Sequence, residues 1–401
     1  MIRFRWVLLV CVLAAPAWAG SRKVTVAQLE DLLRTMKQDK KSDAEVAEAL
    51  KQVELTEQLT RPAMNTMVEF VPGPYSTEQM YVLEARTADL IPPAAYLPST
   101  STPDAAAQKA LLARAETYVT GTYAKLPGLS ATRTTLRFQD NMQAVASSSG
   151  IVGSASEAVT SSGIGQANSY IRYINSTKSP VALEHGAEKR SAEKDETRWG
   201  ANRMIALQSP DPDLGTVFHE ARQSGTLQWL RWEVVNGKPA AVFSFTVPRK
   251  LSRLDVNVCC FPSINQTGVA RFYTPATSGA LGGGGTGGGG VSGNYQTNTE
   301  WHEFSTTAPY HGEFFLDPDS GIVVRMIVET ELKPSDVVHQ VDTRVDYGPV
   351  KAGATAFVVP LKSFVNTVVV PGGESGSGSY TTRTTLFTSE FTDYMLQAGR
   401  R

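Results

Sequence analysis

The chain has 401 residues, of which 41% are hydrophobic and 19% are charged. This is enough apolar material for roughly two or three domains with a sizeable core. Its 38 basic and 39 acidic residues nearly cancel, and this balance argues against nucleic acid as a partner.

Residues 1–19 have the features of a cleaved signal peptide. Arg3 and Arg5 precede an apolar stretch at 6–15 that is too short to span a bilayer, and Ala17-Trp18-Ala19 fits a cleavage pattern. A lipoprotein signal ending at Cys11 is the alternative, but bulky residues precede that cysteine where small ones are expected. We therefore predict an exported protein, periplasmic or secreted, whose formal charge becomes −3 when the two arginines are removed. No later apolar stretch approaches about 18 residues, so no transmembrane span is expected.

Residues 20–91 are expected to form an N-terminal helical region. Thr25 followed by Gln28, and Ser42 followed by Glu45, are capping-box signatures that predict two consecutive helices within 25–60. A third helix is predicted over 77–90. The Pro/Ser/Thr-rich stretch at 92–103 then reads as an extended linker.

The remaining chain, 104–395, is expected to combine one long helix with an antiparallel sheet. Asp104 caps a helix predicted from 105 to about 125, whose apolar stripe packs on a sheet or, alternatively, forms a groove for a cofactor or partner. The Ser/Gly/Ala-rich stretch at 144–168 and the glycine-rich stretch at 279–293 are predicted to be flexible insertions.

Two hairpins are the clearest strand signals. Asn236-Gly237 predicts a tight turn within 227–247, and Asp317-Pro318-Asp319-Ser320-Gly321 predicts another within 310–331. In the second hairpin, alternation places apolar and charged side chains on opposite faces. The apolar set is Ile322, Val324, Met326 and Val328, and the charged set is Arg325, Glu329 and Glu331.

Further alternating strands are predicted at 337–347, 355–370 and 380–394. Strands that follow one another without intervening helices indicate an antiparallel sheet. The predicted fold is therefore α+β, with a helical N-terminal region and a large curved, half-barrel-like sheet packed on the long helix.

The aromatic hairpin and the long helix together define a candidate apolar site. A packed core is the simpler interpretation, and an apolar ligand cavity is the alternative. The side chains that would line such a cavity are Leu112, Val119, Trp232, Phe243 and Phe245.

No catalytic or metal site is predicted. His302, Glu303 and His311 lie near one another in sequence, but their spacing matches no metal-binding pattern. Asp317 and Gly321 resemble a calcium loop only superficially and fit turn chemistry better. No G-x-S-x-G nucleophile elbow occurs.

Cys259 and Cys260 are the only cysteines left after cleavage. As neighbours, they would either form a strained disulfide or remain as thiols, and one is expected to pack as a small apolar residue. No cofactor is expected.

Several segments together resemble a family of exported bacterial proteins without an assigned function. They are 53–59, 126–133, Trp229 with Trp232, 242–248, 259–261, 310–312, 316–318 and Gly321. The C-terminal strand series is also similar to the curved antiparallel half-barrel of LolA-type periplasmic lipoprotein carriers, a fold that holds an acyl chain between its sheet and its helices. This second resemblance implies an apolar ligand by analogy of fold alone.

Three hypotheses of function follow. The first is an exported non-enzymatic protein that binds an apolar ligand, a lipid or a lipidated protein, between sheet and helix. The second is an envelope structural or interaction protein with a packed core, whose N-terminal helices dock a partner. The third and weakest is an envelope hydrolase.

Overall fold

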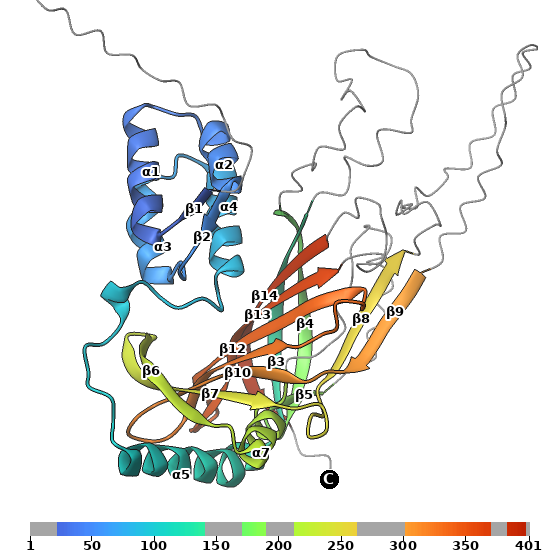
Figure 1. Cartoon of the computed structure of the whole chain (residues 1–401). Helices are drawn as coiled ribbons and strands as arrows, with labels where there is room; N and C mark the ends of the chain where they lie inside the picture. Colours follow the sequence, from blue (N-terminus) through green and yellow to red (C-terminus); the bar gives the residue numbers. More distant parts are fainter. Residues whose placement is uncertain (1–21, 141–170, 190–211, 263–300, 370–382, 398–401) are drawn as a thin grey trace, which may run out of the picture.

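The protein is an α+β structure built around a large antiparallel sheet, as the sequence predicts (Figure 1). The computed structural model describes residues 22–140, 171–189, 212–262, 301–369 and 383–397. The predicted signal peptide and both predicted insertions lie outside the described residues.

The first part of the chain, 22–96, folds as a compact helical unit, hereafter the helical unit (Figure 1). Its elements are β1 (Arg22–Val24), α1 (Val26–Gln38), α2 (Asp43–Lys51), β2 (Val53–Leu55), α3 (Arg61–Met67), η1 (Val68–Phe70), α4 (Pro74–Arg86) and η2 (Ala94–Tyr96). Both predicted capping boxes are present, at Thr25 and at Ser42. The second predicted helix ends at Lys51, and residues 53–55 instead form β2, which pairs in parallel with β1 and was not predicted.

Two prolines lie at the starts of helices. Pro62 and Pro74 occupy the first turns of α3 and α4, where a missing N–H costs nothing because no intrahelical partner exists there. The third predicted helix therefore starts at Pro74 rather than at Thr77.

A ten-stranded, fully antiparallel sheet forms the body of the protein, open rather than closed into a barrel. Its strand order is β5-β4-β3-β14-β13-β12-β11-β10-β7-β6. The strands are β3 (Leu129–Asp140), β4 (Ile171–Glu184), β5 (Ala187–Lys189), β6 (Gln228–Val235), β7 (Lys238–Val247), β10 (Tyr310–Leu316), β11 (Val323–Thr330), β12 (Val338–Ala352), β13 (Thr355–Val369) and β14 (Arg383–Leu396).

The β6–β7 turn has the geometry that its sequence predicts. Asn236 and Gly237 both take positive φ angles, 52° and 78°, which suit the twist of a two-residue hairpin. In the β10–β11 hairpin, the pairing shifts register between Phe315 and Leu316. Val323, rather than Val324, therefore joins Met326 in the main core, which corrects the predicted alternation.

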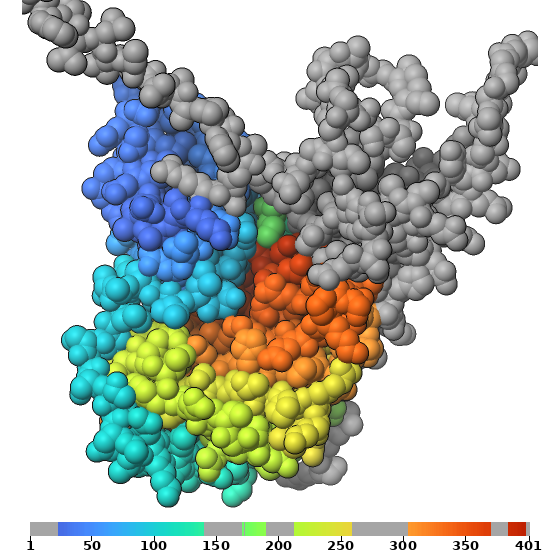
Figure 2. All heavy atoms as spheres, viewed as in Figure 1, coloured from blue at the N-terminus to red at the C-terminus, as the bar shows by residue number. Residues whose placement is uncertain are grey.

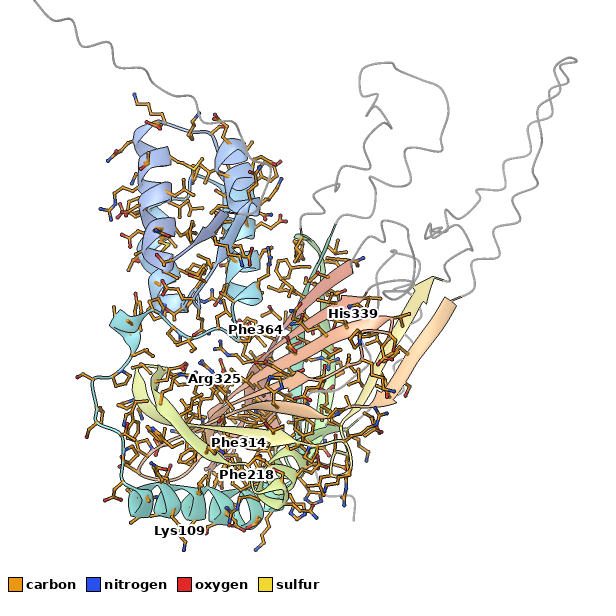
Figure 3. The ribbon with its side chains drawn as sticks, viewed as in Figure 1. Lys109, Phe218, Phe314, Arg325, His339 and Phe364 are labelled. Atoms are coloured by element: carbon orange, nitrogen blue, oxygen red, sulfur yellow. The ribbon has the colours of Figure 1, made fainter. Side chains whose placement is uncertain are left out.

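One face of the sheet, hereafter the α5 face, is covered by α5 (Ala105–Gly121) and α7 (Leu214–Ser224). A 3-10 turn, η3 (Tyr123–Lys125), ends the α5 segment. Phe218 of α7 and Phe314 of β10 meet in this layer with ring centroids 5.2 Å apart (Figure 3). The arm formed by β8 (Asp255–Pro262) and β9 (Trp301–Thr307) packs on Val341, which shares this face with Val345.

The helical unit covers part of the opposite face, hereafter the N-terminal face. Val82 and Ala85 of α4 pack with Phe364 and Leu386 of the sheet. The sheet is thus a middle layer with different partners on its two sides (Figure 1), and the space-filling view shows the blue-to-cyan helical unit beside the orange and red strands (Figure 2).

Candidate functional site

Helix α5 is fixed by its cap and by its apolar stripe. The Asp104 side chain accepts a hydrogen bond from the backbone N–H of Ala107 at 2.8 Å, which satisfies an otherwise unpaired donor at the helix start. The stripe predicted from the sequence is buried against the sheet, as expected. Its members are Leu111, Ala115, Tyr118 and Val119.

The five side chains predicted to line an apolar cavity belong to this same packed cluster. Val119, Phe243 and Phe245 are fully buried, while Leu112 and Trp232 are half-buried against them. Phe245 stacks on Phe314 with ring centroids 4.5 Å apart. The space directly beneath α5 is filled by these contacts, and the grooves described below are lined by other residues.

An open groove of about 590 Å³, hereafter the α5 groove, runs along the side of the helix. Its walls are α5, the turn between β10 and β11, and the beginning of β13. It is lined by Ala113, Arg114, Thr117, Tyr118, Thr122, Leu126, Ser320, Ile322, Ala356, Phe357 and Val358. Its apolar members are drawn from three segments that are far apart in the sequence.

The turn that forms one wall is held directly on the helix. Asp317 accepts hydrogen bonds from the backbone N–H of Ser320 at 2.8 Å and of Asp319 at 3.1 Å, so its carboxylate shapes the turn as predicted. Gly321 has a φ of 74°, and a Cβ there would lie 2.5 Å from the Cβ of Arg114. Only glycine fits this close approach, so the turn and the helix form one rigid wall.

Tyr118 lines the α5 groove and carries a polar group without a partner in the described part of the chain. The residue is 8% exposed, and its hydroxyl is buried without a hydrogen-bond partner among the described residues. Burial raises the pKa of this hydroxyl, which therefore stays protonated and available as a donor. An unsatisfied buried hydroxyl is costly in a protein, and this one is a candidate contact for a molecule from outside the chain.

A second groove of about 370 Å³ adjoins the first at Ile322 and Val358, which line both. It extends the apolar lining toward the β6–β7 hairpin, where Val235 and Pro239 contribute. The exposed guanidinium of Arg114 donates to the carbonyl of Pro318 at 2.9 Å, which places a cation on the rim of the α5 groove. An apolar surface with one donor and one cation at its edge suits an amphipathic molecule.

The N-terminal face of the sheet carries a charged layer that the sequence analysis did not predict. Its members are Arg231, Glu233, Glu313, Arg325, Arg344 and Asp346. Arg325 was expected on a polar face, yet it is only 6% exposed. Strand alternation identifies the face correctly, but it cannot reveal that another layer covers that face.

Acidic groups also gather where the helical unit meets the sheet. Burial raises the pKa of Asp342 to about 7, with Glu329 and Asp89 adding to the effect. His311 lies 3.0 Å from Glu329 and 3.3 Å from Glu331, and its hydrogen bond to Glu329 is the main reason that its pKa is raised. His311 is thus held between two carboxylates of β11 and the residues that follow it.

The described residues include only some of the side chains considered as metal ligands. Within the described residues, no group of three or more His, Cys, Asp or Glu side chains is arranged to hold a metal ion. The side chains of His302, Glu303, Cys259 and Cys260 lie outside the described part of the structure. No helix in that described part is long and apolar enough to cross a membrane.

Comparison of the chain with family models, with curated proteins and with solved structures found no match. The resemblances noted in the sequence therefore remain predictions.

Proposed function

We propose that this is an exported, non-enzymatic protein that binds an amphipathic ligand, a lipid or the acyl chain of a lipidated protein, in the α5 groove. The observation that carries the proposal is the unpaired, buried hydroxyl of Tyr118 beside an apolar lining. The site lies next to α5 rather than beneath it, because the space beneath the helix is filled by core side chains.

The size and chemistry of the groove support this assignment. Its volume of about 590 Å³ falls within the range of roughly 300–1,000 Å³ that is typical of small-molecule sites. Leu126, Ile322 and Phe357 offer apolar contact for a chain. Arg114 and Tyr118 offer a charge and a hydrogen-bond donor for a polar headgroup.

A second candidate function is partner docking by the helical unit. Val68 and Tyr75 are 60% and 65% exposed on this unit and offer apolar contact to a partner. A protein that uses this surface would not need a ligand in the α5 groove.

Uptake of a dansyl-labelled fatty acid by the purified protein tests the proposal, together with mass spectrometry of organic extracts. Ala113 lines the groove, so Ala113→Trp should fill it and reduce affinity by about tenfold or more. Ala106→Trp, on an exposed position of the same helix outside the groove lining, is the matched control and should leave affinity unchanged.

Tyr118→Phe should weaken binding several-fold, since it removes the donor but keeps the ring. Equal affinity of the Ala113→Trp variant and the wild type would contradict the proposal. So would repeated absence of both bound lipid and probe uptake, and that outcome would favour the docking hypothesis.

A further inference from the structure

A cleft lies between the helical unit and the N-terminal face of the sheet, hereafter the charged cleft. Its volume is about 570 Å³. Figure 3 shows Arg325 and Phe364 at this junction, below the helical unit and against the strands. Its ionisable lining consists of Arg61, Glu84, Arg325, Arg344, Asp346, Lys362 and Glu390.

The floor of the charged cleft is a largely buried set of charges. Asp346 accepts hydrogen bonds from Arg325 Nε at 2.6 Å and from Arg344 Nη2 at 2.8 Å. Arg344 also donates to the carbonyl of Ala88, at the end of the α4 segment, at 2.7 Å. These bonds tie the two layers together and fix the orientation of both guanidinium groups.

Buried charged side chains are uncommon where a core serves stability alone. Removing charges from water is costly, and well-packed apolar residues often stabilise a core equally well. Buried ionic groups in a cleft are therefore functional candidates. The aromatic ring of Phe364 lies under two of the cations, 5.1 Å from Arg344 and 4.6 Å from Lys362, and orients them further.

Lys362 is the cation in the cleft with the weakest contacts to acidic groups. Its Nζ lies 3.7 Å from the nearest oxygen of Glu390 and 3.9 Å from that of Glu84, and neither distance is a hydrogen bond. The ammonium group carries three donors, and its side chain is only 18% exposed. Glu84 is already engaged by Arg61 at 2.9 Å.

We propose that the charged cleft binds a small molecule through a carboxylate or phosphate group, which Lys362 and Arg61 receive over the floor of buried arginines. The lining has four cations and three carboxylates, and Asp346 is fully used by its two arginines. An anionic group therefore supplies the acceptors that the donors of Lys362 lack. The volume again fits a small molecule rather than a macromolecular surface.

Calorimetric titration of the purified full chain with inorganic phosphate, and separately with acetate, tests this site. We expect weak but saturable binding of at least one anion, and the stronger of the two identifies the preferred group. Lys362→Gln should reduce that affinity by about tenfold, the loss expected for one charge-assisted hydrogen bond. Lys351→Gln, at an exposed position of β12, is the matched control and should bind as the wild type does.

Two further readouts keep the result interpretable. Arg61→Gln, at a position whose side chain is 41% exposed, should also weaken binding with little effect on folding measured by circular dichroism. Fatty-acid uptake should be unchanged in Lys362→Gln, because the α5 groove lies on the other side of the sheet. Unaltered anion affinity in Lys362→Gln, or no binding of either anion at about 50 mM, would overturn the proposal.

Discussion

Replacing Asp346 with asparagine tests whether the buried charges hold the sheet together. Asp346 lies between Arg325 and Arg344 at 2.6 and 2.8 Å, and all three side chains are nearly inaccessible to water. Asparagine keeps the size of the side chain but removes its charge. Arg325 would then keep Glu233, 3.3 Å away, as its acidic partner, and Arg344 would keep its hydrogen bond to the carbonyl of Ala88. Breaking a buried pair in this way costs about 3–5 kcal/mol.

Glu390→Gln is the matched control. Its side chain is 60% exposed and lies 3.7 Å from Lys362, so the same chemical change should cost at most about 1 kcal/mol. Urea unfolding of the purified protein, followed by circular dichroism and by tryptophan fluorescence, measures both variants. The comparison is valid where both probes report one transition with similar m-values.

Two measurements test whether Asp346 stabilises the sheet through its two arginines. A loss below about 1 kcal/mol for Asp346→Asn would refute the reasoning, because it would mean that water or rearrangement compensates the buried arginines. If the pairing is direct, Asp346→Asn and Arg344→Gln should be non-additive, with a coupling energy of about 0.5–3 kcal/mol.

The pH dependence of the unfolding free energy is an independent test of the same pairing. Burial acts to raise the pKa of Asp346, but the two arginines outweigh it and hold that pKa well below its usual range. The stabilisation is therefore present above about pH 4, the unfolded value, and is lost as the pH falls.

Two other changes are expected to act through burial and space. Burial raises the pKa of Asp342 to about 7, so the free energy of unfolding falls as the pH rises from about 4 to about 7. Asp342→Asn should remove this loss and be more stable than the wild type by on the order of 2–4 kcal/mol at pH 8, with no gain at pH 4. Urea unfolding at both pH values checks this. If the unfolding free energy of Asp342→Asn depends on pH as that of the wild type does, Asp342 is not the source of the loss. Gly312→Ala should destabilise by about 2 kcal/mol or more, because a Cβ there would lie 2.0 Å from the carbonyl oxygen of Ile327. Gly121→Ala, with open space around the position, should be neutral or slightly stabilising in thermal unfolding, and equal losses at the two glycines would contradict this account.

Local signals predicted local structure accurately. The capping boxes at Thr25 and Ser42 and the turns at Asn236-Gly237 and Gly321 form as expected, because each depends on a few neighbouring residues. The register shift near Phe315 was not predictable, since alternation in one strand does not show how its partner is aligned. The pairing of β1 with β2 was missed because it joins short segments about thirty residues apart.

The candidate sites were less predictable than the fold, because their walls come from distant parts of the chain. Phe243, Phe245 and Val119 were correctly assigned to the layer between helix and sheet, but the sequence cannot distinguish a packed layer from a hollow one. The α5 groove depends on the contact between Arg114 and the turn at Pro318, two positions far apart in sequence. Arg325 is buried only because the helical unit and its neighbours cover a face that alternation alone marks as polar.

The arrangement of layers separates the two proposed sites physically. The α5 groove is built from α5 and the segment after it, the β10–β11 turn and β13, and the close contact between that turn and the helix depends on Gly321. The charged cleft needs both the helical unit and the sheet, since Arg61 and Glu84 come from the first and Lys362 from the second. Any movement of the helical unit would therefore alter the anion site while leaving the apolar groove intact. The hydrogen bond from Arg344 to the carbonyl of Ala88 joins the floor of the charged cleft to the helical unit. An anion bound over that floor would therefore favour the arrangement in which the helical unit packs on the sheet.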